Sequence, residues 1–162
     1  MNARGVVFVH SSPTAVCPHV EWAISGVLGT KVSLQWTPQP AVHGQLRAEC
    51  TWSAPVGTGG AIAGALRAWT MLRFEVTEEP SPGADGERFC YVPTLGLWRG
   101  QTGASGDIVI GENRLRTLLE ETPPAQVPAR VHDLLGSAWD DALEAFRYAG
   151  DGAPVTWLHQ VG

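Results

Sequence analysis

A short apolar run near the start of the chain, residues 5–9, constrains the fold more than any other stretch. The run shows no alternation of apolar and polar residues, and it ends abruptly in small polar residues and Pro13. Such a run, bounded by turn signals, is typical of a strand buried on both faces, and therefore of the centre of a sheet. We expect the first half of the chain to be arranged around this strand.

Helices and strands flank this run in a regular order. Apolar residues at helical spacing predict a helix over residues 19–29, and a second helix, weakened by glycine, opens at residues 57–60. Strict alternation of apolar and polar residues predicts strands over 31–37, 46–52 and 71–77. This order is the split βαβ pattern of ferredoxin-like folds. It places the first and third strands in the middle of an antiparallel sheet, with both helices on one face.

The prediction for the whole chain is an α+β fold in a single domain, residues 1–162. Its ferredoxin-like βαββαβ core spans about residues 4–80. Residues 81–162 extend this core with a C-terminal β-meander and two helices that pack on it. The extension is predicted to contain three short strands and two helices, over residues 87–92, 95–101, 107–110, 112–121 and 128–148.

Composition excludes several classes of protein. A hydrophobic fraction of 44% indicates a globular chain, and a formal net charge of −5 argues against a nucleic-acid or anionic membrane surface. The N-terminal run is too short for a signal peptide, and no stretch approaches the ~20 apolar residues of a membrane span. Cys17, Cys50 and Cys90 are widely spaced and form no disulfide framework. We therefore expect a cytoplasmic protein with no nucleic-acid or membrane partner.

Polar candidates for chemistry gather where the first strand ends. In the predicted topology this edge holds His10, Ser11, Ser12, Cys17, His19 and His43. Imidazoles and a thiol are suitable zinc ligands, and a thiol at a helix N-terminus with a histidine as base is suited to nucleophilic catalysis. The spacing matches no strong metal pattern, however, so no metal is predicted. The simpler interpretation is structural, with Cys17 packed as a small apolar side chain and His10 bonded to the loop.

The opposite edge of the sheet offers a candidate anion site. It is predicted to hold Arg4, Lys31, Gly57, Thr58, Gly59 and Gly60. Free amides at a helix N-terminus, where glycine allows close approach, bind phosphate or carboxylate groups. The pattern is neither a Walker A loop nor a dinucleotide fingerprint. Glu78 and Glu79 at the same edge weaken the prediction, and a tight turn that simply requires glycine is the competing interpretation.

Five strings in the sequence resemble an actinobacterial family of proteins with a domain of unknown function. The strings are VHSSP at 9–13, CPHVEW at 17–22, WTPQP at 36–40, LRFEVTE at 72–78 and YAGDGAPVTWLH at 148–159. The resemblance covers essentially the whole chain and implies a cytoplasmic actinobacterial protein. It also implies a gene context near type II fatty-acid synthesis, which makes an acyl-CoA or acyl-carrier ligand a candidate for the anion edge. It supplies no catalytic residues.

The function predicted from these observations is binding rather than catalysis. We expect a regulatory or accessory protein, without a cofactor, that binds a partner protein or a small anionic metabolite in acyl-lipid metabolism. The alternative is a small enzyme that uses Cys17, or a metal held by His10, His19 and His43, at the edge between the first strand and first helix. The sequence leaves the ligand, the oligomeric state and the question of catalysis open.

Overall fold

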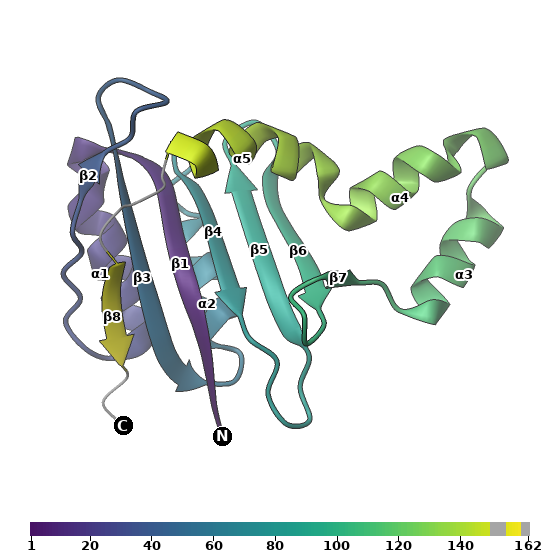
Figure 1. The fold of residues 1–162 in the computed structure, drawn as a ribbon, viewed down its shortest axis with the longest axis horizontal. Coiled ribbons are helices and arrows are strands. Elements are labelled where there is room, and N and C mark those ends of the chain that lie inside the picture. Colours follow the sequence, from purple (N-terminus) through teal and green to yellow (C-terminus); the bar gives the residue numbers. More distant parts are fainter. Residues whose placement is uncertain (150–154, 160–162) are drawn as a thin grey trace.

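The computed structural model describes residues 1–149 and 155–159. Within this part of the chain, eight strands form one sheet in the order β2-β3-β1-β4-β5-β6-β7, with β8 beside β3 (Figure 1). Every pairing is antiparallel except that of β8 with β3, which is parallel. The strands are β1 Asn2–Pro13, β2 Thr37–Pro38, β3 Gln45–Pro55, β4 Arg73–Glu78, β5 Gly86–Val92, β6 Gly96–Thr102, β7 Ile108–Val109 and β8 Val155–His159.

Helices lie on both sides of this sheet and beyond its edge. They are α1 Cys17–Leu28, α2 Thr58–Leu66, α3 Glu112–Glu121, α4 Val127–Leu135 and α5 Ser137–Ala149. Figure 1 shows α1 and α2 behind the sheet, α5 crossing the face toward the viewer, and α3 and α4 extending past β7. We call the face toward the viewer the front face. The prediction of an α+β chain with an antiparallel sheet is confirmed, and β1 lies between β3 and β4 as expected.

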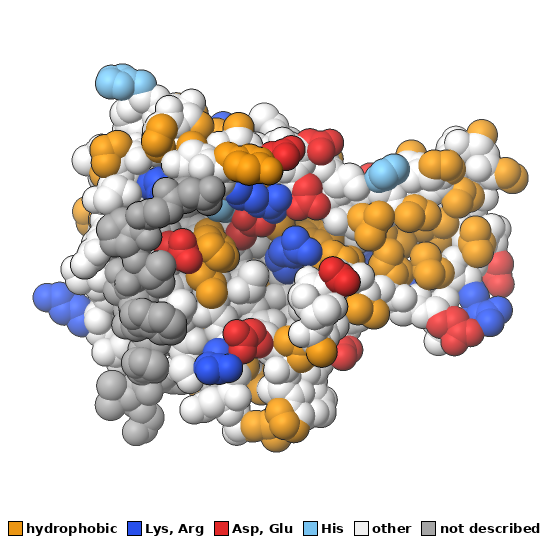
Figure 2. Space-filling model, viewed as in Figure 1, with side chains coloured by type: hydrophobic (Ala, Val, Ile, Leu, Met, Phe, Trp, Pro, Cys, Tyr) orange, Lys and Arg blue, Asp and Glu red, His pale blue; other side chains and the backbone are white. Residues whose placement is uncertain are grey.

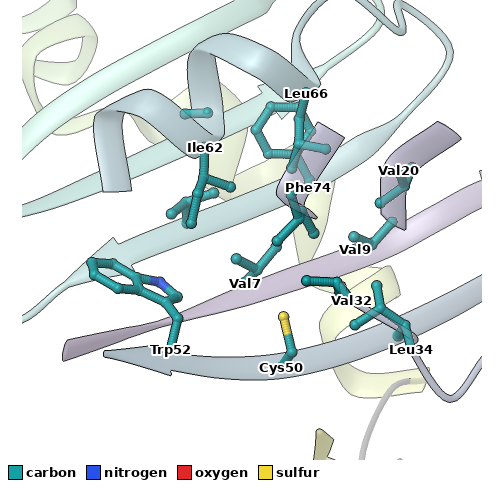
Figure 3. Packing of buried hydrophobic residues seen from close by; sticks show 14 of the residues in the cluster. Val7, Val9, Val20, Val32, Leu34, Cys50, Trp52, Ile62, Leu66 and Phe74 are labelled. Carbon is teal, nitrogen blue, oxygen red and sulfur yellow. The ribbon is translucent and has the colours of Figure 1, made fainter. Parts of the chain in front are cut away.

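The main core fills the space between the sheet and the pair α1 and α2. Side chains from β1, β3 and β4 point into it and meet the apolar stripes of both helices (Figure 3). Phe74 of β4, Ile24 of α1 and Ile62 of α2 are completely buried there. Burial of a side chain of this size contributes about 1.5–3 kcal/mol, so this layer stabilises the first half of the chain.

The predicted strand over residues 31–37 is largely wrong, because only Thr37 and Pro38 join the sheet. Val32 and Leu34 are buried as the alternation indicates. Their backbone amides, however, donate to side chains of α1: Val32 to Ser25 Oγ at 2.9 Å, and Leu34 to Glu21 Oε1 at 3.0 Å. With its donors satisfied by a helix, this segment needs no strand partner.

The free edge of β3 is occupied instead by a segment from the far end of the chain. β8 pairs with β3 in parallel, from Glu49 opposite Val155 to Ser53 opposite His159. In Figure 1 β8 lies beside β3, on the side where the predicted second strand was expected. Local periodicity carries no information about this pairing, which joins residues 106 positions apart in the sequence.

The second half continues the sheet as the predicted meander of β5, β6 and β7. A smaller core of Cys90, Val92, Trp98 and Leu143 fixes α5 to the front face of β5 and β6. Trp98 Nε1 donates to the carbonyl of Asp133 at 3.1 Å. These contacts attach the C-terminal helices to the sheet.

The single long helix predicted over residues 128–148 is also wrong. The structure divides it into α4 and α5 at Gly136, whose φ of 71° lies in the left-handed region. A Cβ at Gly136 would lie 2.7 Å from the Trp98 ring, so both the turn and the close approach require glycine. The extension therefore contains three α-helices rather than two. No helix in the described part of the chain is long and apolar enough to cross a membrane.

Candidate functional site

A groove runs over the front face between α5 and the loop that follows β6. Its larger part, about 760 Å³, is lined by Thr77, Arg88, Thr102 and residues 103–106. A smaller hollow of about 300 Å³ is lined by His10, Arg47, Ala48 and Glu49. Phe8, Glu75 and Arg147 line both parts, so we treat them together as the front groove. Figure 2 shows basic and acidic side chains gathered over this region.

The side chains of the groove follow from the period of the strands. Glu49, Phe8, Glu75 and Cys90 are directly opposite one another on β3, β1, β4 and β5. Because alternate residues of a strand face opposite sides, this row points to the front while its neighbours enter the main core. The row therefore crosses four adjacent strands.

Glu75 is the centre of a buried polar network. Its carboxylate accepts from His10 Nε2 at 2.6 Å and from Arg147 Nε at 2.9 Å, and the Cys90 thiol donates to it at 3.4 Å. Burial alone would raise the pKa of Glu75, but the hydrogen bonds from His10 and Arg147 outweigh it and lower the pKa to about 2. Glu75 is therefore a buried anion that His10 and Arg147 stabilise.

The same network holds α5 in place. The hydrogen bond to Glu75 raises the pKa of Arg147, and Arg147 Nη2 also donates to Asp140 Oδ1 at 3.0 Å on the same helix. Burial and the charge of Glu75 raise the pKa of the Cys90 thiol, which stays protonated as a donor. Arg47 donates to the backbone carbonyl of Ala149 at the end of α5.

Most carboxylates around the groove have partners within the protein. Glu78 accepts from the amides of α2, Glu79 pairs with Arg4, and Glu87 pairs with Arg99. The two arginines neutralise the charges of Glu79 and Glu87, and the amides stabilise the charge of Glu78.

Arg88 and Glu49 differ from these side chains. Neither forms an ion pair with another residue that the structure describes. Both are half-buried, and they lie in different parts of the groove. Burial raises the pKa of Glu49, although the charges of Arg47 and His10 partly oppose the change. Chemically, Arg88 is suited to bind an anionic group, and Glu49 to accept a hydrogen bond or a proton.

At the predicted anion edge, the structure shows a protein carboxylate where the sequence predicted a bound anion. The Glu78 carboxylate accepts from the amide of Gly57 at 3.0 Å and from that of Gly59 at 2.9 Å. The Thr58 hydroxyl donates to the carbonyl of Pro55, and Gly60 faces the ring of Phe89. A carboxylate of the protein itself thus occupies the helix N-terminus at which an external anion was expected.

The two cations predicted for that edge lie in other surroundings. Arg4 forms an exposed ion pair with Glu79 at 3.3 Å. Lys31 lines a shallow hollow beside α1, together with His19, Trp22 and Trp69. The structure therefore does not bring Lys31 together with the glycines of α2 in one hollow.

Of the residues predicted at the first edge, Ser12 and Cys17 are in contact, whereas His10 lies in different surroundings. The Cys17 thiol donates to Ser12 Oγ at 3.5 Å, and burial raises rather than lowers the pKa of Cys17. Arg73 donates to Ser11 Oγ at 3.3 Å. His10 instead faces the front and bonds to Glu75.

The other two histidines of that edge lie away from His10 and Cys17. His19 stacks on Trp69 with ring centroids 4.6 Å apart, and His43 is exposed in the loop before β3. Among the described residues, no group of three or more His, Cys, Asp or Glu side chains is arranged to hold a metal ion.

Sequence reasoning missed Glu49, Glu75, Arg88 and Arg147 as site residues. A signal was present for Glu49 and Glu75, because charged side chains alternate with apolar ones on the predicted strands 46–52 and 71–77. No comparable signal marks Arg147, which resembles any other charged residue of an amphipathic helix.

Comparison with known proteins gives a family but no characterised relative. Residues 6–160 match the family described as a protein of unknown function, DUF3145, and the chain belongs to that family. No curated protein matches the sequence significantly, and no solved structure does either.

Proposed function

We propose that this chain is a non-catalytic binding protein that holds a small anionic metabolite in the front groove, with the anionic group on Arg88. The observation that carries the proposal is the half-buried Arg88, which forms no ion pair with another described residue, in a groove whose carboxylates other than Glu49 have partners of their own. A guanidinium in such a setting binds carboxylate or phosphate oxygens in a bidentate manner.

The size of the groove supports a small-molecule ligand. Its larger part, at about 760 Å³, falls within the range of about 300–1,000 Å³ that is usual for such sites. Phe8 supplies an apolar surface between the two parts. Three strand spacings separate β3, which carries Glu49, from β5, which carries Arg88, and these correspond to roughly 15 Å between the Cα atoms of the two residues. An elongated ligand with an anionic end at Arg88 and a hydrogen-bond donor at Glu49 fits this layout.

The positions of the nucleophile candidates favour binding over catalysis. Burial raises the pKa of Cys17, Cys50 and Cys90, and that of Cys50 reaches about 12, so the thiols are poor nucleophiles at neutral pH. The alternative enzyme at the edge between β1 and α1 requires Cys17 to act with His10 or His19, and these three side chains face different surroundings.

The experiment is a ligand screen by thermal shift, followed by titration calorimetry of each hit. The probes are phosphate monoesters, dicarboxylates and coenzyme A thioesters, since these present the anionic groups that Arg88 would bind. We expect one class to raise the melting temperature of the wild-type protein and to bind at least tenfold more weakly to Arg88→Gln, because a bidentate contact to a charged group is lost. Arg67→Gln is the matched control, since Arg67 is an exposed arginine that directly follows α2. Equal affinity of wild-type and Arg88→Gln proteins would contradict the proposal.

We infer further that β1, α1, β2, β3, α2 and β4 form a ferredoxin-like unit in which β8 replaces most of the second strand. The strand order β2-β3-β1-β4 and the common face of α1 and α2 support this inference. The buried, unpaired state of all three cysteines supports a reducing cytoplasmic compartment. The actinobacterial origin and the role in acyl-lipid metabolism remain proposals that rest on the sequence resemblance, and the coenzyme A thioesters test the latter.

A further inference from the structure

The helical arm formed by α3 and α4 lacks the burial that a stable element needs. Neither helix contains a buried residue. Figure 1 shows the arm extending beyond β7, so the sheet does not cover it. Isolated helices of about ten residues are marginal in water, because packing of an apolar face supplies most of a helix's stability. The arm therefore requires a partner.

An apolar face on this arm is open to solvent. Figure 2 shows apolar side chains gathered over α3 and α4. The apolar residues of the two helices are half-buried or exposed: Leu115, Leu118, Leu119, Val127, Val131, Leu134 and Leu135. Leu119 is the most open of the large ones, with 62% of its surface exposed. Grouped apolar side chains of this kind mark an interaction surface.

Charges beside the apolar face of α3 identify the partner. Arg114 and Glu121 are seven residues apart, so they lie on the same side of the helix at opposite ends. Neither forms an ion pair with another described residue. On the other side of the face, Glu112 and Arg116 already pair within α3 at 2.6 Å. On the side of α3 that carries Arg114 and Glu121, the charges without an ion pair are therefore one cation near the N-terminus and one anion at the C-terminus.

This pattern is complementary to itself only in the antiparallel orientation. Two copies of α3 related by a two-fold axis place Arg114 of each copy against Glu121 of the other, whereas parallel packing would oppose like charges. The helix dipole also favours the antiparallel orientation. Glu120 and Glu121 occupy the last turn of α3 without a basic residue, which the dipole disfavours, and an arginine from a second copy offsets this cost.

We propose that the protein forms a homodimer through this arm, with the α3 helices antiparallel across a two-fold axis and the apolar faces of α3 and α4 buried between the copies. The interface lies on the arm, and no residue of α3 or α4 lines either described part of the front groove.

Sedimentation velocity over a concentration series tests the dimer directly. We expect a reversible dimer of the wild-type protein, and a monomer for Leu119→Asp, because a carboxylate would be buried in the apolar interface. Leu119 is exposed within a single copy, so this variant should keep the circular dichroism spectrum of the wild type. A wild-type protein that remains monomeric would overturn the proposal and would indicate that a different partner covers the arm.

Charge reversal tests the orientation. Arg114→Glu and Glu121→Arg each create like-charge contacts in the antiparallel dimer and should raise its dissociation constant about tenfold. The double variant exchanges the two charges and should restore the wild-type constant. Arg67→Glu, directly after α2, is the control for net charge. The two-fold arrangement would be overturned if the single variants left the dissociation constant unchanged, or if the double variant failed to restore the wild-type value.

Discussion

At the scale of single residues, Glu75 shows how a buried charge can stabilise the fold. Its pKa falls from the ordinary value of 4.5 to about 2 on folding, so its stabilisation is complete above about pH 4.5 and disappears as the pH falls toward 2. A difference of this size corresponds to about 3 kcal/mol of unfolding free energy. We predict that Glu75→Gln is less stable than the wild type at pH 7 and that its stability changes less between pH 5 and pH 2.

Urea unfolding at a series of pH values measures this difference. Glu144→Gln is the matched control, because Glu144 is an exposed carboxylate on α5, the helix that carries Arg147. The control should follow the wild-type curve. If the unfolding free energies of the wild-type and Glu75→Gln proteins fell equally between pH 5 and pH 2, the network would not stabilise the fold.

Gly5 is a second residue at which the addition of a single atom, a Cβ, is expected to change the stability of the protein. A Cβ there would lie 1.8 Å from the carbonyl oxygen of Thr77 and 2.5 Å from the Trp52 ring. We predict that Gly5→Ala destabilises the protein by about 3 kcal/mol or more, because the clash involves the backbone at the centre of the sheet. Gly26→Ala should instead stabilise it by about 0.5–1 kcal/mol, because Gly26 lies within α1 with open space around it. Thermal unfolding of both variants measures the contrast, and equal effects would contradict it.

At the scale of elements, α2 depends on a contact from outside the helix. Its sequence is rich in glycine, and the two amides at its start are bound by Glu78 at the end of β4. We predict that Glu78→Ala costs about 1–2 kcal/mol, as the loss of a helix cap does. Glu79→Ala should cost less than about 1 kcal/mol, because its ion pair with Arg4 is exposed. Urea unfolding compares the two, and similar losses would mean that Glu78 does not act as a cap.

The elements also show what the sequence can predict. Alternation over residues 31–37 correctly indicated that Val32 and Leu34 are buried, because periodicity reports which side of a segment meets the core. It did not identify the hydrogen-bond partners of the segment, which are Glu21 and Ser25 of α1. Similarly, the apolar stripe across residues 128–148 was real, but the break at Gly136 depends on the distant Trp98 ring.

At the scale of the whole molecule, the candidate site was hidden because it is assembled from distant segments. The sites predicted from the sequence lie at strand ends and at a helix N-terminus, because neighbouring residues along the chain define such positions. The front groove instead joins Glu75 to Arg147, which is 72 residues away, through the packing of α5. Only a contact between the two halves of the chain creates it, and no periodic pattern within one half predicts that contact.

The position of α5 makes the groove dependent on the smaller core. Leu143 is completely buried among Cys90, Val92 and Trp98, and it holds the helix that carries Arg147 over the sheet. We predict that Leu143→Ala costs about 2–5 kcal/mol and releases α5 before the main core unfolds, because α1 and α2 keep their own contacts. Hydrogen exchange should then be faster in α5 and β6 while β1 and β3 retain protection. Met71→Ala, at an exposed side chain outside the arm, is the control and should leave both regions unchanged. If Leu143→Ala accelerated exchange equally throughout the sheet, the two cores would form one cooperative unit, and the groove would open only when the whole protein unfolds.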